Sequence, residues 1–187
     1  MKSLRSMVLM LLTISGVAWA SEPVPSLYDL EARLVDQDGR PTTLDLGRGQ
    51  PVLISMFYAT CPHACPMLIR KIKKIEAQLP PEAQGKVQVV MVSFNGERDS
   101  NEKLWKLKDA HGVDPARWHF TRTEASSVEE LAAVLGIKYR FLPDGAINHT
   151  TVITLLGPDG ELLARVDGTD QPVDDLVEKL RTLTAAR

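Results

Sequence analysis

Two cysteines are the residues of this chain best suited to chemistry. Cys61 and Cys65 are its only cysteines, they are separated by three residues, and a proline follows each of them. Two thiols this close can form a redox-active disulfide, a structural disulfide, or a pair of ligands for one metal ion. A disulfide that closes so short a loop adds little stability by the chain-entropy model. The spacing therefore favours chemistry, and it leaves the redox and metal-binding hypotheses both open.

Pro66 indicates how the second cysteine is placed. Proline is tolerated in the first turn of a helix, and the residue before a proline avoids helical backbone angles. The sequence therefore predicts a helix that begins at Pro66, with Cys65 as its N-cap and residues 61–64 as a turn ahead of it. The helix dipole and the free N–H groups at this end would stabilise a thiolate.

Strand-like and helix-like segments alternate around this cysteine turn. The predicted strands cover residues 51–58, 86–94, 118–123, 149–157 and 161–168. The predicted helices cover residues 66–79, 99–112, 126–136 and 172–183. A β-hairpin with its turn at Asp38–Gly39 precedes them. This order predicts an α/β fold with a central mixed sheet flanked by helices, and it puts the cysteines at the carboxyl end of a buried strand, where such sheets carry their sites.

The N-terminal residues predict export. A short basic stretch, "MKSLR", precedes an apolar run and the small residues of "AWA", which is the pattern of a secretory signal peptide. The apolar run is shorter than the roughly 20 residues of a membrane span, although a retained anchor is the alternative. We predict a signal peptide at residues 1–20, a linker at 21–29 and one domain at 30–187, located in the periplasm without a membrane span after cleavage.

The net charge and the predicted cellular compartment limit the classes of function that the protein can have. The net charge of −2 argues against nucleic-acid binding, and nothing in the chain resembles a basic nucleic-acid surface. Thiols outside the cytoplasm tend to become oxidised and to stay oxidised. A free pair of cysteines in the periplasm therefore requires a reductant or a bound metal.

Histidines are the candidates for a further metal ligand. Two thiolates and an imidazole suit copper or zinc, whereas structural zinc usually takes four protein ligands. The chain has four histidines. His111 lies at a predicted helix end, His119 lies on a predicted strand, and His63 lies between the cysteines. His149 lies where a loop meets a predicted buried strand, and it is either a ligand or an ordinary polar residue that caps the strand.

These residues, in this order, resemble the Sco family of SenC/PrrC-like copper proteins. The similar segments are "GRPTTLDLGRGQPVLISMFYATCPHACPML", "VQVVMVSFNGERDS" and "INHTTVITLLGPDGELLARVDG", within residues 27–183. The chain departs from the family pattern at Asn148, where an acidic residue is usual, and at Asn95–Gly96, where Asp-Pro is frequent.

The resemblance implies a thioredoxin-like fold that binds one copper ion through Cys61, Cys65 and His149. It also implies that the protein assists copper delivery to the dinuclear copper site of cytochrome c oxidase. The expected partner is the copper-accepting subunit of that oxidase, or another exported copper or thiol protein.

The alternative function is that of a thiol–disulfide oxidoreductase, in which Cys61 attacks and Cys65 resolves the mixed disulfide. Thioredoxin-type enzymes usually have two residues between their cysteines and a cis-proline facing them. This chain has three intervening residues, and Thr150 and Thr151 stand where that proline is expected. A peroxidase ranks below both, because no activating arginine and threonine pattern precedes Cys61. An inert Cys61–Cys65 disulfide is the last possibility that we consider.

Overall fold

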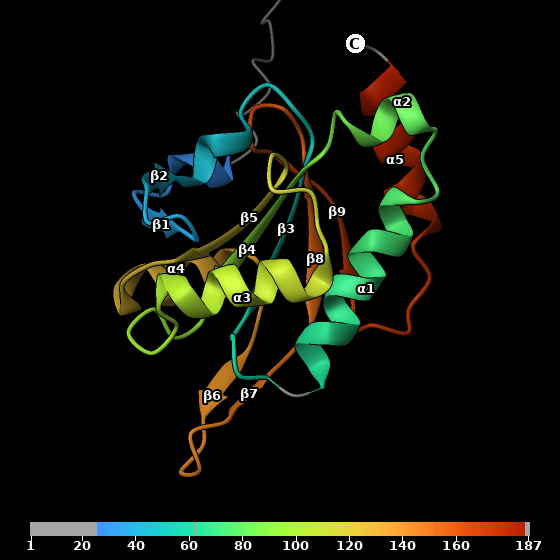
Figure 1. Ribbon diagram of the computed structural model, residues 1–187. Helices are drawn as coiled ribbons and strands as arrows, with labels where there is room; N and C mark the ends of the chain where they lie inside the picture. The colour runs from blue at the N-terminus through green and yellow to red at the C-terminus, as the bar shows by residue number, and fades with distance from the viewer. Residues whose placement is uncertain (1–25, 62, 186–187) are drawn as a thin grey trace, which may run out of the picture.

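The computed structural model describes residues 26–61 and 63–185, and these residues form a mixed α/β fold (Figure 1). The predicted signal peptide at residues 1–20 and most of the predicted linker lie outside the described residues. The strands of the central sheet are β1 (Arg33–Asp36), β2 (Pro41–Thr43), β3 (Val52–Phe57), β4 (Gln88–Ser93), β5 (Trp118–Arg122), β8 (Val152–Leu156) and β9 (Leu162–Asp167). They lie in the order β2-β1-β5-β4-β3-β8-β9.

The middle of this sheet is parallel and its borders are antiparallel. β3 pairs in parallel with β4, and β4 pairs in parallel with β5. β8 runs antiparallel to β3, and β1 runs antiparallel to β5. All six residues of β3 are buried, as expected of a central strand that is covered on both faces. The predicted central mixed sheet is confirmed.

Helices flank the sheet (Figure 1). They are α1 (Ala64–Glu76), α2 (Pro81–Gln84), α3 (Asn101–His111), α4 (Ala125–Val134) and α5 (Asp174–Ala185), together with the short 3-10 helices η1 (Leu27–Asp29) and η2 (Leu44–Gly47). α5 packs against β9, and α3 packs against β5. In α1 the buried apolar residues recur every three or four positions, which is the spacing of a helix with one face in the core.

The predicted N-terminal hairpin is confirmed. β1 pairs with β2, and the turn between them includes Gly39 in a left-handed conformation with φ of 81°. Asp36 Oδ1 accepts hydrogen bonds from the N–H groups of Asp38 and Arg40, which holds this turn closed.

The end of the predicted linker is folded onto the domain. Leu27 is buried and its N–H donates to Gly160 O at 2.8 Å, while the Ser26 side chain accepts from Tyr28 N–H at the start of η1. Residues 26–29 therefore pack against the turn that follows β8. The Leu27 side chain also fills part of the core.

The structure contains a second hairpin that the sequence does not predict. β6 (Tyr139–Phe141) and β7 (Ile147–His149) pair antiparallel as a sheet of their own, in a stretch that is expected to be a loop up to His149. Asp144 Oδ1 accepts from Ala146 N–H in its turn, and Gly145 there has φ of 85°. Figure 1 shows this hairpin projecting from the body at the end where α1 begins.

Within residues 26–61 and 63–185, none of the helices has the length and apolar character that a membrane span requires.

Candidate metal centre

The cysteine loop connects the end of β3 to the start of α1. The predicted helix start is wrong by two residues: α1 begins at Ala64 with His63 as its N-cap, so that Cys65 lies inside the first turn and not at the cap. Pro66 is the third helical residue, where an N–H group has no intrahelical acceptor in any case, and proline is therefore tolerated there. Met67 N–H donates to His63 O at 3.3 Å and closes this turn.

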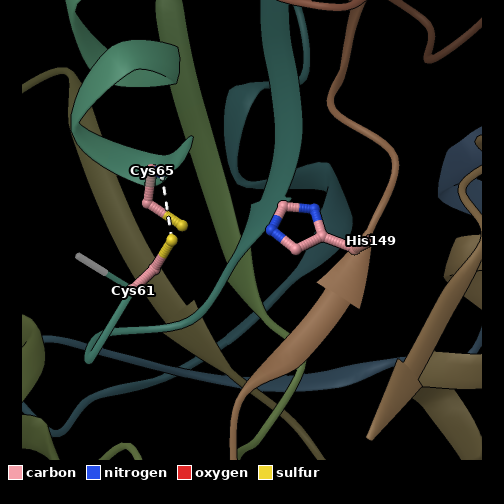
Figure 2. Close-up of side chains that lie close together, drawn as sticks. All are labelled: Cys61, Cys65 and His149. Carbon is pink, nitrogen blue, oxygen red and sulfur yellow. Dashed lines mark hydrogen bonds between the residues drawn. The ribbon is translucent and has the colours of Figure 1, made fainter. Parts of the chain in front are cut away.

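Cys61, Cys65 and His149 meet at the carboxyl end of β3. Their candidate ligand atoms all lie within 4.8 Å of one another. Figure 2 shows both sulfurs beside the start of α1 and the imidazole facing them from the end of β7. Both cysteines are free thiols, with Cys61 partly exposed and Cys65 buried. The described part of the chain holds no second cluster of three such residues with metal-ligand spacing.

The two thiols have opposite electrostatic environments. Partial burial by itself raises the pKa of Cys61, but hydrogen bonds from Cys65, from His63 N–H and from the Tyr58 hydroxyl outweigh it, so that the pKa lies below its usual value. One of these bonds is from Cys65 N–H to Cys61 Sγ, at 3.3 Å. Burial raises the pKa of Cys65 far above its usual range. Cys61 is therefore the sulfur that ionises first.

His149 presents a free nitrogen to the sulfurs. Its Nδ1 lies 3.1 Å from Thr150 O, and a carbonyl can only accept, so that this contact is a hydrogen bond when Nδ1 holds the proton. Nε2 then keeps its lone pair, and it is buried without a hydrogen-bond partner among the described residues. Burial lowers the pKa of His149, which keeps the ring neutral. A buried imidazole nitrogen without a partner fits a metal ligand.

Aromatic rings surround this imidazole. The rings of Tyr58 and Phe94 lie 5.9 Å and 4.8 Å from that of His149, and Phe94 also lies 5.1 Å from Tyr139. The sequence alone does not predict that these rings belong to the site. A signal for them exists, because Tyr58 and Phe94 each directly follow a buried strand, and the carboxyl ends of β3 and β4 are paired in register.

A buried carboxylate holds the cysteine loop in place. Asp99 is 2% exposed, and its Oδ2 accepts hydrogen bonds from Ala59 N–H at 2.8 Å and from the Ser93 hydroxyl at 2.6 Å. It thereby ties the loop after β3 to the end of β4. Its negative charge also contributes, after burial, to the raised pKa of Cys65. Asp99 lies in the segment that resembles the Sco family, but its function in the loop was not predicted.

The other histidines lie outside this group of three. His63 is exposed at the N-cap of α1 and makes no capping hydrogen bond with its side chain. His111 ends α3, as predicted. His119 lies on β5, as predicted, with its Nε2 at 3.1 Å from Gln88 Oε1.

Residues 24–185 match the family model for SCO1/SenC, so the chain belongs to this family, as its resemblance predicts. One relative is the SCO1 protein homolog of Bacillus subtilis (strain 168). It is 24% identical over 168 residues, which cover 87% of this chain and 86% of the relative.

Solved structures share the fold. The copper-bound ScoI of Bradyrhizobium japonicum superposes with a TM-score of 0.68 at 20% identity, over 81% of this chain and 96% of that one. BsSco is described as a Sco-family cytochrome c oxidase assembly protein with a disulfide switch. It superposes with a TM-score of 0.69 at 23% identity, over 88% of this chain and 99% of that one. The predicted thioredoxin-like architecture is confirmed.

Proposed function

We propose that this protein binds one copper ion, as Cu(I), through Cys61, Cys65 and His149 and passes it to another protein. The observation that carries this proposal is the group of three ligand atoms within 4.8 Å, one of which is a buried Nε2 without a partner among the described residues. Two thiolates and an imidazole are donors that suit copper, and structural zinc would usually take a fourth protein ligand. The copper-bound relative with the same fold supports the choice of metal.

Copper is the cargo of this site, and the exposure of the ligands indicates how it leaves. Cys61 is partly exposed, whereas Cys65 is buried. An incoming thiolate or thioether of an acceptor therefore reaches the copper on the side of Cys61 and displaces that ligand first. His149 and Cys65 release the ion in later exchange steps.

The acceptor in this proposal is the copper-accepting subunit of cytochrome c oxidase, with transfer taking place in the periplasm. Membership of the SCO1/SenC family supports this acceptor, as does the description of BsSco as an oxidase assembly protein. The basic and apolar pattern of residues 1–20 supports export.

A competitive titration tests copper binding. The reduced protein is titrated with Cu(I) against a chelator, with His149→Ala and the control His111→Ala in parallel. We expect one copper per chain and a loss of affinity well above tenfold in His149→Ala, because a direct ligand is lost. His111→Ala should bind as the unaltered protein does. Equal affinity in all three proteins would remove His149 from the site.

Thiol–disulfide exchange is the second candidate function, and the difference between the two thiols favours it. Cys61 is accessible and its pKa is lowered, as an attacking thiol requires, while Cys65 is close enough to resolve the mixed disulfide. In this reaction both thiols are oxidised to one disulfide, and the partner's disulfide is reduced to two thiols. Reduction of a disulfide substrate by the copper-free protein, undiminished in His149→Ala, would support this function over copper transfer.

A further inference from the structure

A cavity of about 390 Å³ lies between α1 and the loop from β9 to α5. From the side of α1 it is lined by Met67, Arg70, Lys71 and Lys74, and one carboxylate, that of Asp174, lines it from the other side. The lining thus has three cationic side chains and one anionic one. The first turn of the same helix carries Cys65.

The three cations are not equivalent. Lys71 is only 8% exposed, and its ammonium donates to Gly168 O at 3.2 Å and to Gln171 O at 2.6 Å. It therefore anchors the loop that forms the far wall. Arg70 and Lys74 are exposed, and they form no ion pair with any residue in the described ranges. Their charges are thus available to a partner.

This positive surface lies on a chain that is weakly acidic overall. The whole chain has a net charge of −2. Some exposed cations elsewhere are paired, such as Lys106 with Glu102 at 2.6 Å and Lys179 with Asp175 at 2.9 Å. Like-charged side chains four residues apart on a helix repel each other, so the Arg70 and Lys74 pair does not stabilise α1 by itself.

The position of this surface relates it to the metal centre. Met67 is 46% exposed although it is apolar, and it lies two residues beyond Cys65 on the way to Arg70. Figure 1 shows that α1 starts at the cysteine loop, near the base of the β6–β7 hairpin, and runs away from both. Met67, Arg70 and Lys74 thus line this cavity from a helix whose first turn carries Cys65.

We propose that Met67, Arg70 and Lys74 form the docking surface for an acidic segment of the protein that exchanges copper with this site. The partner's carboxylates pair with Arg70 and Lys74, and an apolar side chain of the partner packs on Met67. Complementary charges of this kind raise association rates and select the partner more than they tighten the complex. This proposal specifies the kind of partner that the proposed copper site serves, and it rests on the proposed copper-transfer function.

Two synthetic acceptor peptides test the proposal. Both carry the same Cys-x-x-x-Cys copper-binding sequence with a fluorophore that responds to Cu(I), and they differ only in a flank of glutamates or of glutamines. Copper transfer from the loaded protein is followed by stopped flow. The unaltered protein should deliver copper about tenfold faster to the glutamate peptide at low salt, and this preference should fade as salt screens the charges.

Two double variants with the same change in net charge separate docking from general attraction. Arg70→Glu/Lys74→Glu should lose or reverse the preference for the glutamate peptide. Arg40→Glu/Arg48→Glu changes the charge at the N-terminal hairpin and at η2, and it should keep the preference. An unchanged preference in Arg70→Glu/Lys74→Glu would overturn the proposal, and so would an equal loss in both double variants.

Copper loading is measured before transfer and keeps the two proposals apart. Both double variants should bind one Cu(I) with the affinity of the unaltered protein, since none of the four side chains is a ligand. Failure of the unaltered protein to load copper would overturn the proposed function and its docking partner together. Normal loading with no preference between the peptides would overturn the docking surface alone.

Discussion

The metal centre joins two regions that are held in very different ways. The cysteines follow β3, a strand that is wholly buried, and they enter α1, whose apolar face is fixed in the core. His149 instead ends β7, in a hairpin of two three-residue strands that lies outside the central sheet. Phe141 on this hairpin is 53% exposed. Hydrogen bonds and core packing therefore fix the cysteine side, while ring contacts hold much of the histidine side.

This contrast has an energetic consequence. An isolated two-stranded hairpin is marginally stable, whereas each aromatic pair contributes about 0.5–1.5 kcal/mol beyond its buried area. The rings of Tyr58 and Phe94 therefore matter more for the position of His149 than the few backbone bonds between β6 and β7. A ligand that binds both sides ties the hairpin to the body, so that binding and hairpin stability are linked.

The largest effect is expected on the cysteine side, from Asp99→Ala. This change leaves Ala59 N–H and the Ser93 hydroxyl without their buried acceptor, which costs about 1–3 kcal/mol of unfolding free energy. Copper affinity should also fall by about 10–100-fold, because the cysteine loop loses its support. Urea denaturation and the Cu(I) titration measure the two effects.

Asp109→Ala is the control for this prediction. Asp109 is an exposed aspartate of α3, and its loss should change the unfolding free energy by less than about 0.5 kcal/mol. An equally small change in Asp99→Ala would show that the carboxylate does not anchor the loop.

The second effect sharpens the comparison within the cysteine side. Cys61 has a lowered pKa and is partly exposed, whereas Cys65 is 1% exposed and its pKa is raised. Because only the thiolate reacts, iodoacetamide should modify Cys61 at least tenfold faster than Cys65 in the reduced protein at neutral pH. The rate at Cys61 should rise with pH and reach its plateau at a lower pH than that of an ordinary thiol, whose pKa is about 8.5. Peptide mass spectrometry at several pH values measures both rates, and faster labelling of Cys65 would contradict the assignment.

The same contrast explains how much of the molecule could be predicted from the sequence. The cysteine side is encoded locally: long apolar strands and a proline after each cysteine indicate a strand, a turn and a helix in that order. The helix start was misplaced by two residues because Pro66 is tolerated at any position in the first turn. Ser100 caps α3 and Gly112 ends it in a left-handed conformation, as their residue types indicate.

The histidine side could not be predicted in this way. Strands of three residues are too short to show a period, so β6 and β7 resemble a loop in the sequence. The contact of Phe94 with His149 joins residues that are far apart in the chain. Asp99 likewise acts on a loop 40 residues away. The importance of His149 was inferred from the family resemblance, and its distance from the cysteines required the structure.

The smallest effect tests the histidine side directly. Phe94→Leu removes the contacts of the Phe94 ring with His149 and Tyr139 but keeps an apolar side chain in the core. Copper affinity should fall by about three- to tenfold, the equivalent of one aromatic pair. Phe141→Leu, at an exposed position whose ring contacts Tyr139 but not His149, should lower the affinity less than Phe94→Leu does in the same Cu(I) titration. If Phe94→Leu bound copper as tightly as the unaltered protein, the hairpin's backbone alone would position His149, and the two sides of the site would be held alike.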